Sequence, residues 1–180
     1  ALMRLGKNKI IKQISKAFVE FIRGTPLMIQ LMFVYFGLSK LLNLDISPLV
    51  AGIISVSINS GAYVSEIIRG GINSVSQGQM EAARSLGMTY KDAMQSVIMP
   101  QAIKNIWPAL GNEFISLIKE TSIVSIIGVS DLIFELRAVQ AATYQGIIPI
   151  VIAMLIYFVI TWSLSKLLNY FEGRMNHGTN

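Results

Sequence analysis

The feature that most constrains this chain is an uninterrupted apolar run near its carboxyl end. Residues 147–165 are nineteen consecutive positions without a charged side chain. At a rise of 1.5 Å per residue, this run forms a helix of roughly 28 Å, close to the thickness of the hydrocarbon core of a bilayer. The sequence therefore predicts a chain that spans a membrane.

The composition supports a membrane protein and disfavours an enzyme. Apolar residues make up 53% of the chain and charged residues only 14%, whereas a soluble domain carries roughly a quarter. The absence of cysteine excludes disulfides and thiolate chemistry, and His177 is the only histidine. Because a lone histidine makes neither a catalytic triad nor a metal site, we expect no enzyme activity, no metal and no cofactor in this chain.

Three further segments have the length and apolarity of spans, which predicts an all-α bundle with about four transmembrane helices. They are residues 26–44, 49–67 and 105–127. Gln30 lies inside the first of these segments. The sequence Gly24-Thr25-Pro26 breaks any helix that precedes it, because proline is placed best in the first turn of a new helix.

Residues 1–25 form a basic, amphipathic segment. Apolar side chains recur in it at helical spacing, with lysines between them. They are Ile10, Ile11, Ile14, Ala17, Phe18 and Phe21. A helix of this kind could lie on the membrane surface or pack on a partner. A solvated connector is an equally good interpretation.

The second and third spans each carry a polar stripe. On a helical wheel, Gly52, Ser55, Asn59, Tyr63 and Glu66 fall within about 80° of one another. A second stripe of about 120° holds Asn105, Asn112, Glu113, Ser116, Lys119 and Glu120. Exposing such charges to lipid costs about 2.5–3.5 kcal/mol each, so the stripes must face other helices or a wet cavity. A break is expected around Gly128, and residues 131–145 read as a polar loop or short helix.

Residues 76–100 are the longest polar interruption between the spans. Ser76 could cap a short helix whose third position is Gln79, and Gly87 supplies the left-handed residue that ends such a helix. Thr89 with Asp92 repeats the capping pattern for a second helix, which we expect to stop near Pro100.

The basic residues predict the orientation of the chain. Most lysines and arginines lie before the first span, in residues 69–104 or after the last span, while Lys40 and Arg137 lie on the opposite side. The positive-inside rule then places both ends and residues 76–100 in the cytoplasm.

The polar interruption also resembles a known motif. Glu81-Ala82-Ala83, then Gly87 after three residues, then residues 97–100 after nine more, is similar to the EAA loop of bacterial ABC importer permeases, EAA-x3-G-x9-I-x-L-P. Val97 and Met99 are conservative departures from that pattern. Residues 21–27, 65–72 and 117–122 resemble the polar amino acid branch of these permeases, which serves histidine, glutamine and arginine uptake. The similarity covers nearly the whole chain.

The resemblance implies a type I importer permease in a bacterial inner membrane. Such permeases usually have five spans, so this chain looks truncated before its first residue. They pair with themselves or a sibling, receive an amino acid from an external binding protein, and dock on an ATP-binding subunit that holds ATP and magnesium. The implied docking residues are Glu81, Ala82, Ala83, Gly87 and Pro100. The alternative is that Glu81 only caps its own helix.

An amino acid zwitterion needs contacts of both signs in a low-dielectric path. We expect Lys119 and Glu120 to supply them, with neutral or acidic neighbours along the same path. Those neighbours are Gln30, Asn59, Glu113, Thr121 and Ser122. Alternatively, Lys119 and the acids form a structural ion pair, and Tyr63 and Trp107 are interfacial anchors.

Other functions compete with an ATP-driven importer. A passive channel or ion-coupled carrier would use Glu113, Lys119 and Glu120 as a relay, but it leaves the 76–100 loop without a role. A purely structural subunit of a membrane complex comes next, and an intramembrane enzyme comes last. The sequence does not name the amino acid.

Overall fold

The computed structural model describes Met3 and residues 8–177, with side chains described up to Arg174. Every element within those residues is helical, which confirms the expected all-α fold. Arg4 and Lys7 of the basic segment, and the side chain of His177, lie outside the described part of the chain.

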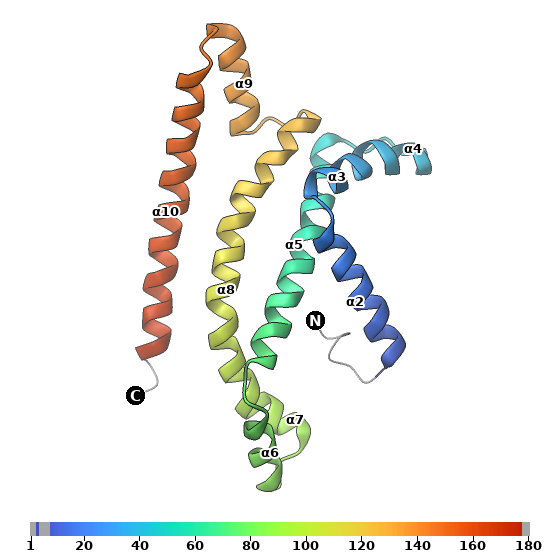
Figure 1. Ribbon diagram of the computed structural model, residues 1–180, viewed down its shortest axis with the longest axis vertical. Coiled ribbons are helices and arrows are strands. Elements are labelled where there is room, and N and C mark those ends of the chain that lie inside the picture. Colours follow the sequence, from blue (N-terminus) through green and yellow to red (C-terminus); the bar gives the residue numbers. More distant parts are fainter. Residues whose placement is uncertain (1–2, 4–7, 178–180) are drawn as a thin grey trace.

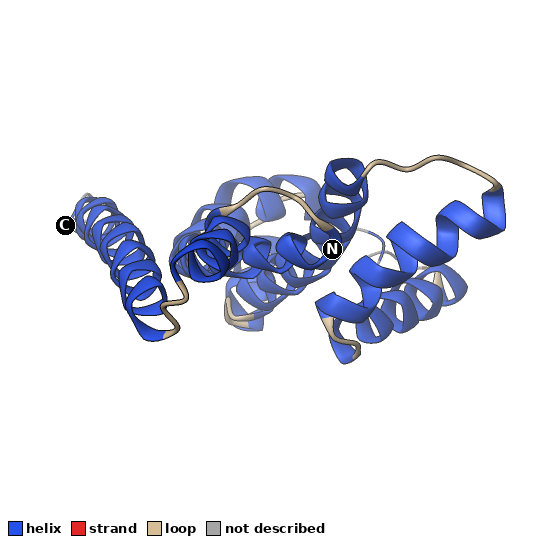
Figure 2. Cartoon of the chain, turned by 90° about the horizontal axis from the view of Figure 1, so that it is seen from above, coloured by secondary structure: helices blue, strands red, loops and turns tan. Residues whose placement is uncertain are grey.

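Three long helices stand side by side and form the body of the molecule (Figure 1). They are α5 (Pro48–Asn73), α8 (Met99–Glu120) and α10 (Ile147–His177). Helix α8 packs against both of the others. Seen from above, the helices are spread out, with α10 at one end (Figure 2). Because the helices do not enclose a thick core, much of their apolar surface faces outward.

Glycines set the approach between these helices. A Cβ added at Gly71 of α5 would lie 2.2 Å from Ile106 Cγ1 of α8, a distance that no real Cβ adopts. On the other side of α8, a Cβ at Gly111 would lie 2.9 Å from Leu168 Cδ1 of α10. Helices α5 and α8 can therefore pack at this distance only where a side chain is missing, whereas at the α8–α10 contact a shift of the Leu168 side chain would be enough.

Helix α2 (Lys9–Gly24) runs beside α5, with Val19 and Ile22 buried against Ala62 (Figure 1). The basic segment thus packs on a helix of its own chain. Helices α3 (Leu27–Met32) and α4 (Ser39–Leu42), joined by the π-helical η1 (Phe33–Leu38), continue from α2 after a bend of 103°.

The predicted spans differ from the observed helices in their bounds. Helices α5 and α10 have the length and apolarity to cross a bilayer, and both extend beyond the predicted segments. The expected first span, residues 26–44, is the second half of a bent pair that meets the same test only when α2 is included. Where each helix enters the bilayer stays a prediction.

The end of the body that follows the carboxyl end of α8 is built from short helices. The 3-10 helix η3 (Thr121–Ile127) follows α8 and ends at Gly128, which has φ +87°. The break expected around Gly128 is therefore observed. Helix α9 (Leu132–Thr143) follows, and Asp131 caps it by accepting the Phe134 N–H at 2.8 Å. Leu31, Val34 and Ala51 pack with Ile127 of η3 in a small buried cluster.

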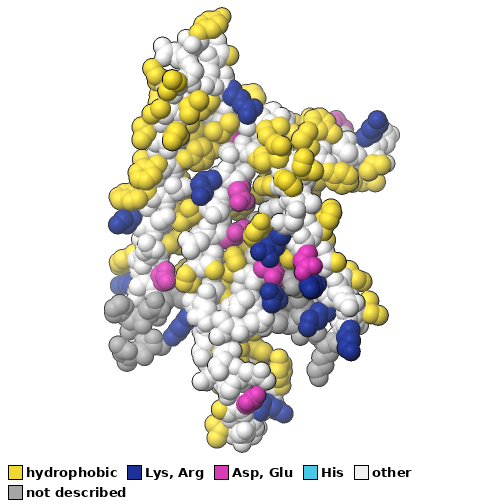
Figure 3. Space-filling view, viewed as in Figure 1, with side chains coloured by type: hydrophobic (Ala, Val, Ile, Leu, Met, Phe, Trp, Pro, Cys, Tyr) yellow, Lys and Arg dark blue, Asp and Glu magenta, His cyan; other side chains and the backbone are white. Residues whose placement is uncertain are grey.

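Side chains divide the surface into apolar and charged zones. Hydrophobic side chains gather over α9, α10 and the α3–α4 segment, while charged side chains gather at mid-height and over α2 (Figure 3). Most large apolar side chains of α10 are exposed, although Ala153 is buried. An apolar outer surface of this kind is what a lipid environment requires.

Candidate functional site

The lower end of the molecule is a helical tip made of α6 (Gln77–Ser85) and α7 (Tyr90–Ala93) (Figure 1). Glu81 and Ala82 are exposed on α6, while Ala83 is buried where α6 meets α7 and the π-helical η2 (Met94–Ile98). The two short helices predicted from the sequence are therefore present, and their exposed face includes two of the implied docking residues.

The turn between the two short helices has the predicted glycine. Gly87 has φ +84°, in the left-handed region that favours glycine. Arg84 Nη1 donates to the carbonyl oxygen of Met88 at 2.8 Å, and the Met88 N–H donates to the carbonyl oxygen of Ala83 at 3.2 Å. These hydrogen bonds join residues close in sequence and close the elbow between α6 and α7.

Of the two predicted caps, one is present. The Thr89 hydroxyl accepts the Asp92 N–H at 3.2 Å and donates to Asp92 Oδ2 at 2.5 Å. Ser76 is the N-cap residue of α6 and Gln79 is its third position, as predicted, but the Ser76 side chain makes no capping hydrogen bond, so that part of the prediction was wrong. The Gln79 N–H is satisfied instead by the backbone carbonyl of Ser76, at 3.0 Å.

The helix that begins at Tyr90 does not stop near Pro100, which corrects the sequence interpretation. The chain passes through η2 into α8, which begins at Met99 and carries Pro100 in its first turn. A proline lacks the N–H that an α-helix needs for its bond to residue i−4, and the wider π-helical turn before it relieves this mismatch. Pro100 is exposed.

A cavity of about 700 Å³ opens at the break between α2 and α3, and it also reaches α5, the end of α8, η3 and α9. Its lining includes polar and charged side chains from all of these regions. They are Arg23, Thr25, Asn59, Tyr63, Glu120, Ser122, Ser125 and Arg137. The cavity therefore brings side chains of both charges to one place, although they lie far apart in the sequence.

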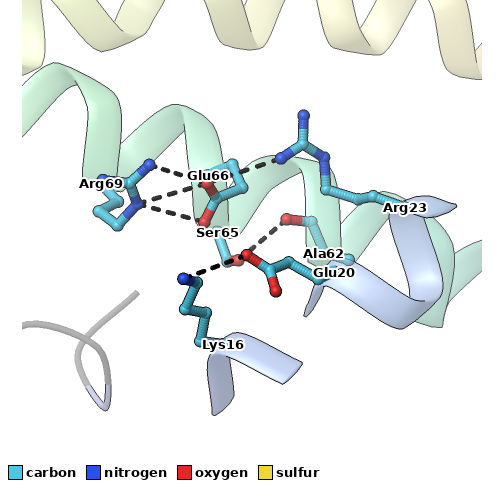
Figure 4. A network of polar contacts seen from close by, with 7 residues as sticks. All are labelled: Lys16, Glu20, Arg23, Ala62, Ser65, Glu66 and Arg69. Atoms are coloured by element: carbon cyan, nitrogen blue, oxygen red, sulfur yellow. Dashed lines mark hydrogen bonds and ion pairs between the residues drawn. The ribbon is translucent and has the colours of Figure 1, made fainter. Parts of the chain in front are cut away.

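Arg23, which lines the cavity, belongs to an ion-pair network between α2 and α5 (Figure 4). Arg23 Nη1 lies 3.6 Å from Glu66 Oε2, and Arg69 Nη2 lies 2.9 Å from the same oxygen. The Arg23 guanidinium also stacks over the ring of Tyr63, 5.0 Å from its centroid. The Glu66 side chain is only 15% exposed, so this shared carboxylate holds Arg23 at the edge of the cavity.

The structure separates the two charges that were predicted to act together. Glu120 lines the cavity, whereas Lys119 lines a different groove, which contains Tyr157 of α10. Adjacent residues on a helix point about 100° apart, so neighbours in sequence face different helices. Thr121 likewise lines a separate apolar groove against α5.

The remaining predicted path residues lie in or near the cavity. Asn59 and Ser122 line it, and Gln30 lies behind Asn59, whose Nδ2 donates to Gln30 Oε1 at 3.1 Å. Glu113 lies further along α8 and accepts a hydrogen bond from Ser60 at 3.5 Å. The roles of all these residues in transport stay predictions.

Sequence reasoning missed both cations of the cavity. Arg23 was assigned to the basic segment and Arg137 to a mixed polar region, yet both line the cavity with Glu120. Arg23 could have been found from its position directly before the Gly24-Thr25-Pro26 break, because a sharp turn of the chain leaves space next to the residues that flank it. Nothing in the local sequence marks Arg137.

An all-helical membrane subunit with a charged cavity and an exposed helical tip has the architecture of a transport permease. The family model described as "Binding-protein-dependent transport system inner membrane component" matches residues 1–177. The chain belongs to this family.

Individual relatives agree with the family. The putative glutamine transport system permease protein GlnP of Rickettsia bellii is 41% identical over 175 residues, which cover 97% of this chain and 80% of that protein. The arginine transport system permease protein ArtQ of Bacillus subtilis is 47% identical over 152 residues, which cover 84% of this chain and 69% of that protein.

Solved structures share the fold. A crystal structure of an amino acid ABC transporter with histidines is 51% identical, with a TM-score of 0.91, and the match covers 96% of this chain and 80% of that one. The MetNI methionine ABC transporter, in an inward-facing conformation, matches with a TM-score of 0.76 at 15% identity, covering 93% of this chain and 77% of that one. The latter likeness concerns the fold alone.

Proposed function

We propose that this chain is the permease subunit of an ATP-driven importer for polar amino acids. It forms the translocation path in a bacterial inner membrane and carries out no chemistry itself. The observation that carries the proposal is the cavity in which Arg23, Arg137 and Glu120 meet. Guanidinium groups suit the carboxylate of an amino acid, and a carboxylate suits its ammonium group.

The helical tip is the proposed contact with the ATP-binding subunit. Glu81, Ala82, Gly87 and Pro100 are exposed. Leu86 at the turn is 85% exposed and adds an apolar side chain to this surface. Ala83 is buried and supports the tip from within. ATP and magnesium then belong to the partner, and no cofactor to this chain.

The remaining components follow from the family's binding-protein dependence. An extracytoplasmic binding protein delivers the amino acid, and a second permease, either another copy or a sibling, completes the path. The helical tip and both ends of the chain face the cytoplasm. The tip lies at one end of α5 and α8, while α9 and the α3–α4 segment lie at the other (Figure 1), which suits this orientation.

Uptake by the complete transporter in proteoliposomes tests the proposal. The expected result is uptake of labelled glutamine, arginine or histidine that requires ATP, the ATP-binding subunit and the binding protein together. Uptake without ATP or without the ATP-binding subunit would favour a passive or ion-coupled carrier. ATP-dependent uptake of a solute other than an amino acid would overturn the substrate class.

A further inference from the structure

The break between α2 and α3 leaves a backbone carbonyl without its usual donor. In a continuous α-helix the Ile22 carbonyl would accept the N–H of residue 26. That residue is Pro26, which has no N–H. This carbonyl belongs to a buried residue, because the Ile22 side chain packs between α2 and α5. An unpaired carbonyl here would be costly, so another donor is needed.

Gln30 supplies that donor from the first helix after the break. Its Nε2 donates to the Ile22 carbonyl at 2.7 Å, and lies 3.0 Å from the Thr25 carbonyl and 2.8 Å from Thr25 Oγ1. Thr25 Oγ1 in turn donates to the Phe21 carbonyl at 2.9 Å. Two side chains thus replace the backbone bonds that the 103° bend removes.

The other end of the Gln30 amide reaches the cavity wall. Gln30 Oε1 accepts a hydrogen bond from Asn59 Nδ2 at 3.1 Å. Asn59 is buried, with 5% of its surface exposed, and lines the cavity. Among Met3 and residues 8–174, whose side chains are described, no group donates a hydrogen bond to the Asn59 amide oxygen. Since the nitrogen end is held by Gln30, that oxygen is the acceptor left for a molecule in the cavity.

We propose that Gln30 is a positioning residue with two connected tasks. The first task belongs to its amide N–H groups, which fix the bend between α2 and α3. The second belongs to its amide oxygen, which orients the Asn59 side chain so that the Asn59 oxygen accepts N–H groups of the transported solute. The inference rests on the proposed function. It differs from a direct role for Gln30 in the path, because both ends of the Gln30 amide are already bound to protein groups.

A double-mutant cycle tests the second task. Gln30→Leu, Asn59→Leu and the double variant are compared for ATP-dependent uptake by the complete transporter. Each single variant is expected to lower uptake about tenfold, and the double variant to lose clearly less than the product of the two single losses, because the part of the Gln30 effect that runs through Asn59 is already lost in Asn59→Leu. Independent, multiplied losses would overturn this role. Gln13→Leu, at an exposed position of α2, is the matched control and is expected to keep wild-type uptake.

Spin-label distances test the first task separately from transport. The chain has no cysteine, so Lys12→Cys on α2 and Leu41→Cys on α4 give specific labels at exposed positions. Gln30→Leu is expected to broaden the distance distribution between the two labels. Gln30→Glu is expected to do the same, because its side chain has the same length but presents an oxygen instead of an N–H group to the Ile22 carbonyl. A distribution as narrow as that of the Gln13→Leu control in both variants would overturn the inference.

The two proposals fail in different ways. A wild-type transporter that takes up no amino acid would refute the proposed function, whatever the label distances show. If the wild-type transporter does take up amino acids, only the role of Gln30 would be refuted by multiplied losses of uptake in the double variant or by unchanged label distances in the Gln30 variants.

Discussion

The helical tip and the cavity are built in opposite ways. Hydrogen bonds within the tip join residues that are close in sequence, such as Arg84 with Met88 and Thr89 with Asp92. Contacts around the cavity join distant residues, such as Gln30 with Asn59. The tip is therefore a local structure that can keep its shape while it meets a partner. The cavity exists only when α2, α5, η3 and α9 are assembled.

The α5–α8 contact connects these two regions. Gly71 near the end of α5 packs on Ile106, and Ser74 just beyond it accepts a hydrogen bond from Asn105 at 2.8 Å. Helix α8 runs from this contact to Glu120 at the cavity. If the tip is a local structure and the cavity depends on distant contacts, substitutions at the tip, at the cavity and at this contact should have separable effects on recruitment of the ATP-binding subunit, on uptake and on stability.

The largest effect is expected at the contact itself. Gly71→Ala places a Cβ 2.2 Å from Ile106 Cγ1 and 3.3 Å from the Ala102 carbonyl oxygen, so either the Ile106 side chain or the two helices must shift. Overpacking of this kind costs typically 1–3 kcal/mol. The thermal unfolding midpoint of the purified transporter should fall, and both uptake and recruitment of the ATP-binding subunit should fall with it.

The neighbouring glycine provides the control for Gly71. Gly70 has nothing within 4 Å of the added Cβ, and alanine favours a helix over glycine by about 1 kcal/mol. Gly70→Ala should keep or slightly raise the unfolding midpoint. Equal destabilisation by both substitutions would show that the close approach of α5 and α8 does not limit stability.

A substitution at the cavity should affect uptake and spare the tip. Arg23→Leu removes a guanidinium from the cavity and one of the two arginines that contact Glu66 (Figure 4). We expect uptake to fall about tenfold while the ATP-binding subunit still copurifies. Lys16→Leu removes an exposed pair with Glu20 and should change uptake less than twofold. Similar losses from both would mean that general charge on α2, rather than the cavity, matters.

Substitutions at the tip should weaken binding of the ATP-binding subunit and leave the cavity intact. Gly87→Val forces a β-branched residue into φ +84°, a strain of about 1–3 kcal/mol that distorts the elbow. Glu81→Lys reverses the charge of an exposed side chain. Both should lower copurification of the ATP-binding subunit several-fold, whereas Gly78→Ala, with its Cβ 3.6 Å from the nearest atom, should not. Normal recruitment and coupled uptake in both variants would exclude a docking role for the tip.

The smallest effect compares the two predicted caps. Thr89→Ala removes an observed cap and should weaken α7 by about 1 kcal/mol. Ser76→Ala removes a hydroxyl that caps nothing and should leave α6 unchanged. Hydrogen exchange of the tip amides measures both. Faster exchange in α6 after Ser76→Ala would mean that the serine hydroxyl caps the helix in solution.

Much of the fold followed from local patterns. The uncharged run at residues 147–165 predicted α10, the polar stripe around Asn59 predicted a buried polar face on α5, and Gly87 predicted the elbow. Each signal depends on residues within a few turns of one another. The packing of α2 on α5 could not be predicted this way, because an amphipathic helix fits many apolar surfaces equally well.

The sequence by itself determined the class of the molecule, its helical tip and the residue types available for a polar path. Only the tertiary structure decided which of them meet. Lys119 and Glu120 are neighbours in the chain but face different grooves, while Arg23, Arg137 and Glu120 share one cavity. The physical reason is that helical geometry turns adjacent side chains apart, and the packing of distant helices, set by close contacts such as that at Gly71, selects which of them come together.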